Sequence, residues 1–181
     1  MTLPHLSGEG AAIRQVLAAY FLRNCRHIVE IGGAGAPITD FLTHSPESVT
    51  VVDPKIEPLE RDEWLGRPCR VRHVAMKFQA TSFDAPAEAL GVVMLGLSLK
   101  PLGARPAIND ALVTLLRRAT VVALDYSLRL DRAVDQAPQL IADAGLTTAV
   151  AIDLAIADGV LDESDHARRR FMVLRPARAL A

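Results

Sequence analysis

The sequence predicts a doubly wound α/β domain with a mostly parallel sheet of seven strands. Three observations lead to this fold class. Short apolar runs alternate with segments of helical periodicity along most of the 181 residues. A glycine-rich turn follows the first apolar run, as at the ligand-binding edge of open α/β sheets. The last two apolar runs have no helix between them, so we expect them to close the sheet as an antiparallel pair.

The first expected element is an amphipathic helix that Ser7 can cap. Its apolar residues follow the i, i+3, i+4, i+7 spacing of a helix that packs one face on a sheet. They are Ile13, Val16, Leu17, Tyr20 and Phe21.

A strand is expected from His27 to Ile31, ending at glycines. Pro37 then stands where a second helix can begin, because proline is favoured at the first helical position. The buried face of that helix is predicted to carry Ile38, Phe41 and Leu42.

The middle of the chain continues the alternation. The strands Val49–Val52 and Arg70–Val74 flank an irregular acidic stretch, in which we expect a crossover helix. The elements expected after them are a strand within Ala89–Leu97, a helix over Ile108–Arg118, a strand at Val121–Leu124, a helix from about Asp131 to Gly145, and strands at Thr148–Ile156 and Arg170–Leu174.

Size and composition fit one domain spanning residues 1–181, because half of the residues are hydrophobic and can form a sizeable core. The formal net charge of −1 gives no electrostatic reason to bind nucleic acid or an anionic membrane surface. We therefore expect a small-molecule partner, with no nucleic acid and no membrane. The start of the chain lacks a secretory-signal pattern, and no apolar run reaches the ~18 residues of a membrane helix. A cytoplasmic location is expected.

Cys25 and Cys69, the only cysteines, are expected to be buried, reduced thiols. The five histidines are scattered without the spacing of a zinc site, so no metal is expected. A hydrophobic chain of this size also predicts a homodimer, in which a second copy covers an apolar patch.

The most informative segment is HIVEIGGAGAPITDF, from His27 to Phe41. Glycines after a strand let the backbone approach a ligand, and Glu30 can accept a hydrogen bond from a ligand's amino group. Asp53 follows the next strand, 23 residues after Glu30, at the spacing of a ribose-binding acid. The alternative is an ordinary tight turn at the glycines and a turn aspartate before Pro54.

With these motifs the chain resembles the class I S-adenosylmethionine-dependent methyltransferases over almost its whole length. That family has an acid and glycines in its first motif, an acid after the second strand, and a closing antiparallel strand pair. The resemblance implies S-adenosylmethionine as cofactor and a Rossmann-like methyltransferase fold. It implies cofactor binding by Glu30, Gly32, Gly33, Gly35, Asp53, Pro54, Met76 and Leu95. It also implies methyl transfer to a small-molecule acceptor.

The glycine pattern departs from that of the family, because Ala34 and Ala36 occupy the second and third glycine positions. This leaves open a protein of the same fold that binds the cofactor without methylating. A nicotinamide-dinucleotide module ranks last, because no Gly-x-Gly-x-x-Gly is present.

No catalytic residue can be assigned, since methyl transfer mainly requires alignment of the acceptor. The chain lacks the Asn-Pro-Pro-aromatic signature of nucleobase amine methylation, and Ser98 and Lys100 follow the fourth parallel strand instead. Tyr126 is a candidate wall of the acceptor site, or part of a strand end. The run Arg168–Arg170 is interpreted as a solvated charged edge, neutralised by Asp158, Asp162, Glu163 and Asp165.

Overall fold

The computed structural model describes residues 9–33, 35–81, 87–95, 106–127, 131–155 and 168–177. Its elements are α1 (Glu9–Phe21), β1 (His27–Ile31), the 3-10 helix η2 (Ile38–Phe41), β2 (Ser48–Val52), β3 (Leu59–Trp64), β4 (Arg67–Val74), the 3-10 helix η3 (Phe78–Ala80), β5 (Leu90–Met94), α2 (Pro106–Arg118), β6 (Val121–Ser127), α3 (Asp131–Asp143), β7 (Leu146–Ala155) and β8 (Arg168–Pro176).

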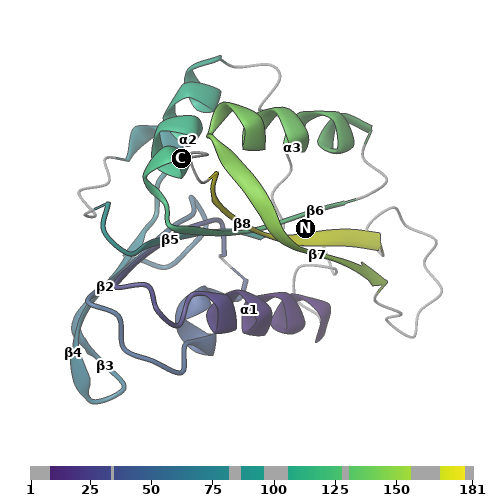
Figure 1. Cartoon of the computed structure of the whole chain (residues 1–181). Helices are drawn as coiled ribbons and strands as arrows, with labels where there is room; N and C mark the ends of the chain where they lie inside the picture. The colour runs from purple at the N-terminus through teal and green to yellow at the C-terminus, as the bar shows by residue number, and fades with distance from the viewer. Residues whose placement is uncertain are drawn as a thin grey trace.

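The strands form one sheet in the order β3-β4-β2-β1-β5-β6-β8-β7. α1 covers one face of this sheet, and α2 and α3 cover the other (Figure 1). The five central strands from β4 to β6 run parallel. Every residue of β1 and β5 is buried, as expected for parallel strands covered on both faces. The doubly wound α/β prediction is confirmed.

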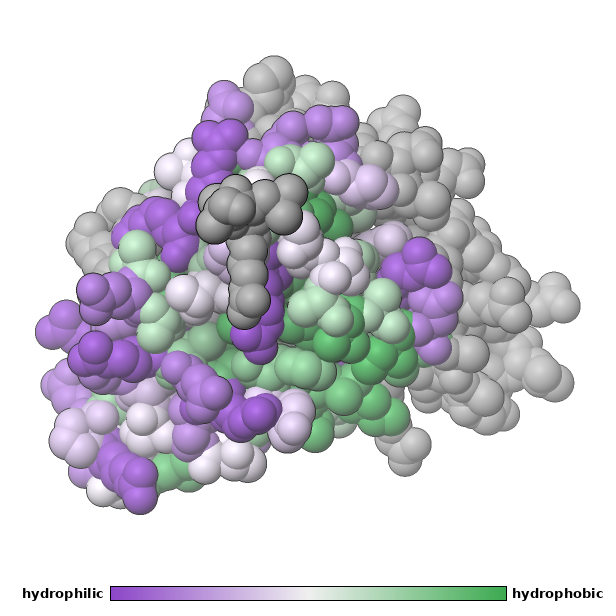
Figure 2. All heavy atoms as spheres, in the orientation of Figure 1, coloured by the Kyte–Doolittle hydropathy of each residue, from purple (hydrophilic) through white to green (hydrophobic). Residues whose placement is uncertain are grey.

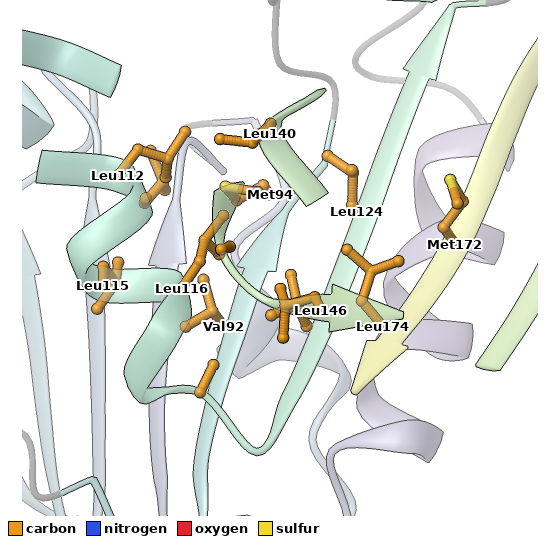
Figure 3. Close-up of a cluster of buried hydrophobic side chains, with 14 of the residues drawn as sticks. Val92, Met94, Leu112, Leu115, Leu116, Leu124, Leu140, Leu146, Met172 and Leu174 are labelled. Carbon is orange, nitrogen blue, oxygen red and sulfur yellow. The ribbon is translucent and has the colours of Figure 1, made fainter. Parts of the chain in front are cut away.

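Apolar side chains fill the space between the sheet and the helices α2 and α3. Leucines on one side of α2 meet residues of β5, β6 and β8, together with Leu140 from α3 (Figure 3). The labelled members of this cluster are Val92, Met94, Leu112, Leu115, Leu116, Leu124, Leu140, Leu146, Met172 and Leu174. A second cluster on the opposite face contains Leu22, Ile28, Val49, Val93 and Phe171.

The closing antiparallel pair is present as predicted. β8 lies between β6 and β7 and pairs antiparallel with both. This arrangement places Arg169 opposite Ser127, two residues beyond Asp125 along β6.

The crossover helix expected between the second and third strands is absent, because all of residues 48–74 are described and they form a hairpin instead. Strand β3 pairs antiparallel with β4 and raises the strand number from seven to eight. Leu65 and Gly66 both have positive φ, at 52° and 71°, which matches the turn of a tight hairpin. Only the ends of β3, Leu59 and Trp64, are partly buried, so the segment has no apolar stripe for a helix. Figure 2 shows mainly hydrophilic side chains over this hairpin.

The helix expected after Pro37 is also shorter than predicted. It forms only the 3-10 turn η2, and Leu42 is already extended with φ −67° and ψ 128°. Ile38 and Leu42 are buried as expected, and Phe41 is half-buried. Pro46 would stop a longer helix at Ser45, because proline disfavours helical geometry at the residue before it.

The predicted buried face of α1 is wrong for three of its five residues, and the other two pack against the core. Ile13, Val16 and Tyr20 are exposed, at 47%, 55% and 58%, and Leu17 and Phe21 are only partly buried. The residues that α1 turns toward the sheet are Arg14, Gln15, Ala18 and Ala19, and Leu22, directly after the helix, is buried with them. The two alanines let the helix lie close to the strands, and the two polar residues have buried partners described below. Apolar surface consequently gathers at the level of α1 (Figure 2). Its coverage by a second copy remains a prediction.

Cys25 and Cys69 are buried and not bridged, as expected, and burial raises the pKa of Cys25 to about 11. Within the described ranges, no helix has the length and apolar character to cross a membrane. Over the same ranges, no three or more His, Cys, Asp or Glu residues come together as a metal site would require.

The orientation of α1 can be tested with one substitution on the helix and one at Leu22, the residue directly after it. Leu22→Ala should lower the free energy of unfolding by about 2–5 kcal/mol, because it empties a fully buried position. Val16→Ala should change it by less than about 0.5 kcal/mol, because Val16 is exposed. Urea unfolding measures both. A larger loss for Val16→Ala than for Leu22→Ala would contradict this orientation.

Candidate functional site

The carboxyl ends of four neighbouring parallel strands meet at one edge of the sheet. Gly32 follows β1, Asp53 follows β2, Met76 lies two residues after β4, and Leu95 follows β5. Backbone hydrogen bonds join these ends. The amide of Gly32 donates to Val52 O at 2.9 Å, and the amide of Asp53 donates to Val74 O at 3.2 Å. The structure therefore brings four of the predicted site residues to the edge where open α/β sheets bind ligands.

The turn after β1 requires glycine at two consecutive positions. Gly32 and Gly33 have φ of +96° and +97°, a conformation that side chains disfavour. A Cβ on Gly33 would lie 2.7 Å from Cδ of Glu30, so the backbone closes directly over that carboxyl group. Gly32 approaches the carbonyl of Leu95, and Gly35 lies in the exposed part of the turn.

Glu30 is enclosed at the centre of this turn with 1% of its surface exposed. Its Oε1 accepts a hydrogen bond from Gln15 Nε2 at 2.8 Å, and its Oε2 accepts one from the amide of Ile38 at 2.7 Å. Burial raises the pKa of Glu30 to about 8, against the opposing effect of these two hydrogen bonds. The negative charges of Asp40 and Asp53 raise this pKa further.

Gln15 is a site residue that the sequence reasoning missed. Its Nε2 also donates to the carbonyl of Ala36 at 2.6 Å, so one amide group ties α1 to both β1 and the glycine turn. Its Oε1 is buried and has no hydrogen-bond partner among the described residues. A buried acceptor without a donor is costly, and it therefore fits a ligand that brings one.

Asp53 takes part in a local turn, as the alternative interpretation expected. Its Oδ1 accepts a hydrogen bond from the amide of Lys55 at 2.7 Å. A carboxylate has lone pairs for several donors, so this bond leaves capacity for ribose hydroxyls. Pro54 and Met76 are exposed beside it, with Met76 at 45%. The ribose role of Asp53 remains a prediction.

A second polar cluster lies where α1 meets β6 and β8. Asp125 is fully buried, and its Oδ2 lies 3.0 Å from Arg14 Nε. Arg169 Nε donates a hydrogen bond to the same oxygen. Arg14 is not among the predicted site residues, and a charged residue in an apolar helix pattern is expected to face solvent.

The interpretation of Arg168–Arg170 as a solvated edge is wrong for Arg169, which is only 5% exposed. It holds for Arg170, whose partly exposed side chain pairs with Asp153 at 2.7 and 3.0 Å. Tyr126, a candidate wall of the acceptor site, is 4% exposed and belongs to the core under α2 and α3. Ser98, Lys100 and the acids Asp158, Asp162, Glu163 and Asp165 lie outside the described residues.

The edge of the sheet thus carries two adjoining sets of polar groups. The first set, over β1 and β2, offers glycine backbone, a buried acid and an unpartnered amide oxygen. The second set, over β6 and β8, offers buried guanidinium groups. The first set suits an amine joined to a nucleoside, since carboxylate and amide oxygens accept hydrogen bonds from an ammonium and from ribose hydroxyls.

Comparison with known proteins supports the fold. No protein-family model and no curated sequence matches the chain. Among solved structures, the N-methyltransferase NodS from Bradyrhizobium japonicum WM9 matches with a TM-score of 0.62 at 13% identity, covering 97% of this chain and 99% of NodS. A putative RNA methyltransferase from Pyrococcus horikoshii matches with a TM-score of 0.58 at 11% identity, covering 95% of this chain and 84% of its own.

A third structure is the 1,6-didemethyltoxoflavin-N1-methyltransferase from Burkholderia thailandensis, with bound 1,6-didemethyltoxoflavin and S-adenosylhomocysteine. It matches with a TM-score of 0.53 at 18% identity, covering 95% of this chain and 84% of its own. The chain therefore has the Rossmann-like methyltransferase fold that the sequence predicted.

The burial of Glu30 predicts a specific dependence of stability on pH. The native state keeps the Glu30 proton up to a pKa of about 8, whereas the unfolded chain loses it near 4.5. Between these values the native state binds more protons, so this group makes stability fall as pH rises, by up to about 1.4 kcal/mol per pH unit. Above pH 8 its contribution is constant.

Urea unfolding of the wild type and Glu30→Gln across this pH range measures the effect. As pH rises, the unfolding free energy of the wild type should fall relative to that of Glu30→Gln. A difference that stays constant from pH 5 to pH 8 would show that Glu30 titrates as in the unfolded chain.

Proposed function

We propose that this protein binds S-adenosylmethionine and transfers its methyl group to a small-molecule acceptor. The observation that carries the proposal is the glycine turn closed over Glu30, with the unpartnered Oε1 of Gln15 beside it. Both groups are acceptors, and they lie at the carboxyl edge of a sheet with the methyltransferase fold. An ammonium group supplies the donor that Gln15 Oε1 lacks, and the Glu30 carboxyl oxygens have further lone pairs for it.

The residues of the edge suit the separate parts of this cofactor. Glu30 and Gln15 would take the amino group of its methionine part, and the backbone of Gly32, Gly33 and Gly35 would line it. Asp53 would accept hydrogen bonds from the ribose hydroxyls. Pro54, Met76 and Leu95 would provide apolar surface to the adenosine and sulfur region.

Bound S-adenosylmethionine supplies an electrophilic methyl group on a sulfonium. The chain's contribution is to hold and align the two reactants, which by itself accounts for a large part of such a rate acceleration. Glu30 adds a proton exchange, because a neighbouring ammonium favours its ionised form and lowers its pKa from the value of about 8 in the free protein. Cofactor binding near neutral pH would therefore release a proton from Glu30.

The choice of a small acceptor is supported by composition and by one of the similar structures. The net charge of −1 offers nothing to attract a polyanion. The toxoflavin-precursor methyltransferase of similar fold carries a small molecule in its structure. We do not assign a catalytic acid or base.

A second candidate is a cofactor-binding protein that does not methylate. Ala34 and Ala36 at positions where the family pattern has glycine favour it. A protein that binds S-adenosylhomocysteine but transfers no label from S-adenosylmethionine to a panel of small amines, alcohols and acids would support this second function.

The cofactor assignment predicts that S-adenosylhomocysteine raises the unfolding temperature. A ligand that binds only the native state stabilises it by about 2.7 kcal/mol at a hundredfold excess over its dissociation constant. NAD should have much less effect, because the chain lacks the dinucleotide glycine pattern. Differential scanning fluorimetry compares the two ligands. Absence of binding heat with millimolar S-adenosylhomocysteine in calorimetry would rule out the cofactor.

The assignment of Asp53 predicts a graded loss of cofactor affinity. Asp53→Ala removes charge-assisted bonds to ribose and should weaken S-adenosylhomocysteine binding by roughly 30- to 150-fold, or about 2–3 kcal/mol. Asp53→Asn keeps one acceptor and the turn to Lys55, so it should fall between wild type and Asp53→Ala. Calorimetry measures the affinities, and unfolding without ligand controls for stability. Wild-type affinity in both folded variants would leave Asp53 with a turn role only.

A further inference from the structure

Three charged side chains are buried together where α1 meets the carboxyl end of β6. Arg14, Asp125 and Arg169 are 4%, 0% and 5% exposed. Arg14 Nε and Arg169 Nε both approach the same oxygen, Oδ2 of Asp125. Two guanidinium groups thus converge on one carboxylate in the interior of the protein.

The carboxylate of Asp125 does not satisfy every donor of Arg169, and a charged group that is buried without full pairing carries a desolvation cost of several kcal/mol. Arg169 has a donor atom, Nη2, that is buried without a hydrogen-bond partner in the described part of the chain. A guanidinium has five N–H donors in a planar fork, and an unsatisfied charged donor is among the costlier groups to bury. This donor calls for an acceptor that carries negative charge.

Arg169 lies near the same edge of the sheet as the residues proposed to bind the cofactor. The groups suited to adenosine lie over β2 and β4, on one side of β1. β5, β6 and β8 follow on the other side, and Arg169 lies on β8 opposite the last residue of β6. Since neighbouring strands are about 4.8 Å apart, β6 and β8 lie roughly 10 to 15 Å from β1. A methyl acceptor placed next to the methionine end of the cofactor would extend from β1 toward β6 and β8.

We propose that Arg169, held in place by Asp125, binds an oxyanion of the methyl acceptor, a carboxylate or a phosphate group. This inference rests on the proposed function and narrows its substrate class to anionic small molecules. The planar guanidinium fork matches both oxyanions in two-point hydrogen bonding. Arg14, on α1, adds positive charge next to Arg169. Its buried position has the same explanation, because it also pairs with Asp125.

The cofactor has a carboxylate of its own, which is the competing source of this oxyanion. The amino group next to that carboxylate is assigned to Glu30 on β1, three strands from Arg169 in the order β1-β5-β6-β8. The acceptor's oxyanion therefore suits the position of Arg169 better. The two sources differ in a testable way, because 5′-methylthioadenosine lacks the amino-acid part of S-adenosylhomocysteine.

Arg169→Met is the variant of choice because Asp125 keeps its ion pair with Arg14 and is not left as an uncompensated charge. Arg169→Lys keeps the charge and loses the fork. Arg175→Met is the matched control, since Arg175 is an exposed arginine of the same strand at the opposite end of the sheet. A cooperative unfolding transition without ligand shows that each variant is folded.

The first measurement is the unfolding temperature with S-adenosylhomocysteine present, in phosphate, acetate or chloride at equal ionic strength, and with acetamide as the neutral analogue of acetate. Wild type and Arg175→Met should gain stability from phosphate or acetate beyond chloride, and none from acetamide. In Arg169→Met the dissociation constant of the effective anion should rise roughly ten- to hundredfold, with a smaller rise in Arg169→Lys. The stronger of the two anions identifies the chemical group.

Three results would overturn the proposal. The first is an equal effect of all anions on the wild type, which contradicts the proposal even if Arg169→Met fails to fold. The second is an equal loss of anion affinity in Arg175→Met. The third is a loss of affinity in Arg169→Met for S-adenosylhomocysteine but not for 5′-methylthioadenosine, which assigns Arg169 to the cofactor carboxylate. Failure of the proposed function looks different. If the proposed function is wrong, the wild type binds neither S-adenosylhomocysteine nor 5′-methylthioadenosine. An anion effect that is still seen in that case would mean that Arg169 binds an oxyanion that does not belong to a methyl acceptor.

Discussion

The enclosure of one carboxyl group, that of Glu30, fixes most of the geometry around the site. A carboxyl group at 1% exposure is stable only if both oxygens have partners or the group keeps its proton, and Glu30 uses both means. Its partners come from α1 through Gln15 and from the start of η2 through Ile38. One side chain therefore determines how the first helix, the first strand and the turn after it lie relative to one another.

The same enclosure explains the unusual spacing of the glycines. Gly33 closes over the Glu30 carboxyl group so tightly that any side chain there would collide with it. Its φ of +97° gives an independent reason for glycine at that position. Gly33 is thus placed by contact with the buried acid, whereas Gly32 lies against the carbonyl of Leu95.

Prediction from sequence succeeded where burial on both faces dictates composition. The runs of β1, β5 and β6 are apolar because helices cover both sides of the sheet, and that pattern identifies them without other information. It failed where a polar residue is buried for a specific partner. Arg14, Gln15 and Arg169 each have the chemistry of a surface residue, and only the three-dimensional positions of Asp125 and Glu30 show why they are inside. Local turn chemistry also decided against the expected alternation of strand and helix, since Leu65 and Gly66 form the turn of a hairpin where a crossover helix was expected.

The exposed apolar residues of α1 follow from this arrangement. A helix has one face toward the sheet, and on α1 that face is occupied by Arg14 and Gln15 in addition to Ala18 and Ala19. Ile13, Val16 and Tyr20 are then left in solvent, against the hydrophobic effect that usually orients an amphipathic helix. Buried polar contacts thus outweigh apolar burial in setting the rotation of α1. Because Arg14 and Gln15 are consecutive, the helix joins the cluster at β6 and β8 to the glycine turn at β1 through adjacent residues. A rigid helix that holds both sets of polar groups keeps them at a fixed separation, which is the requirement for aligning a cofactor with a second molecule.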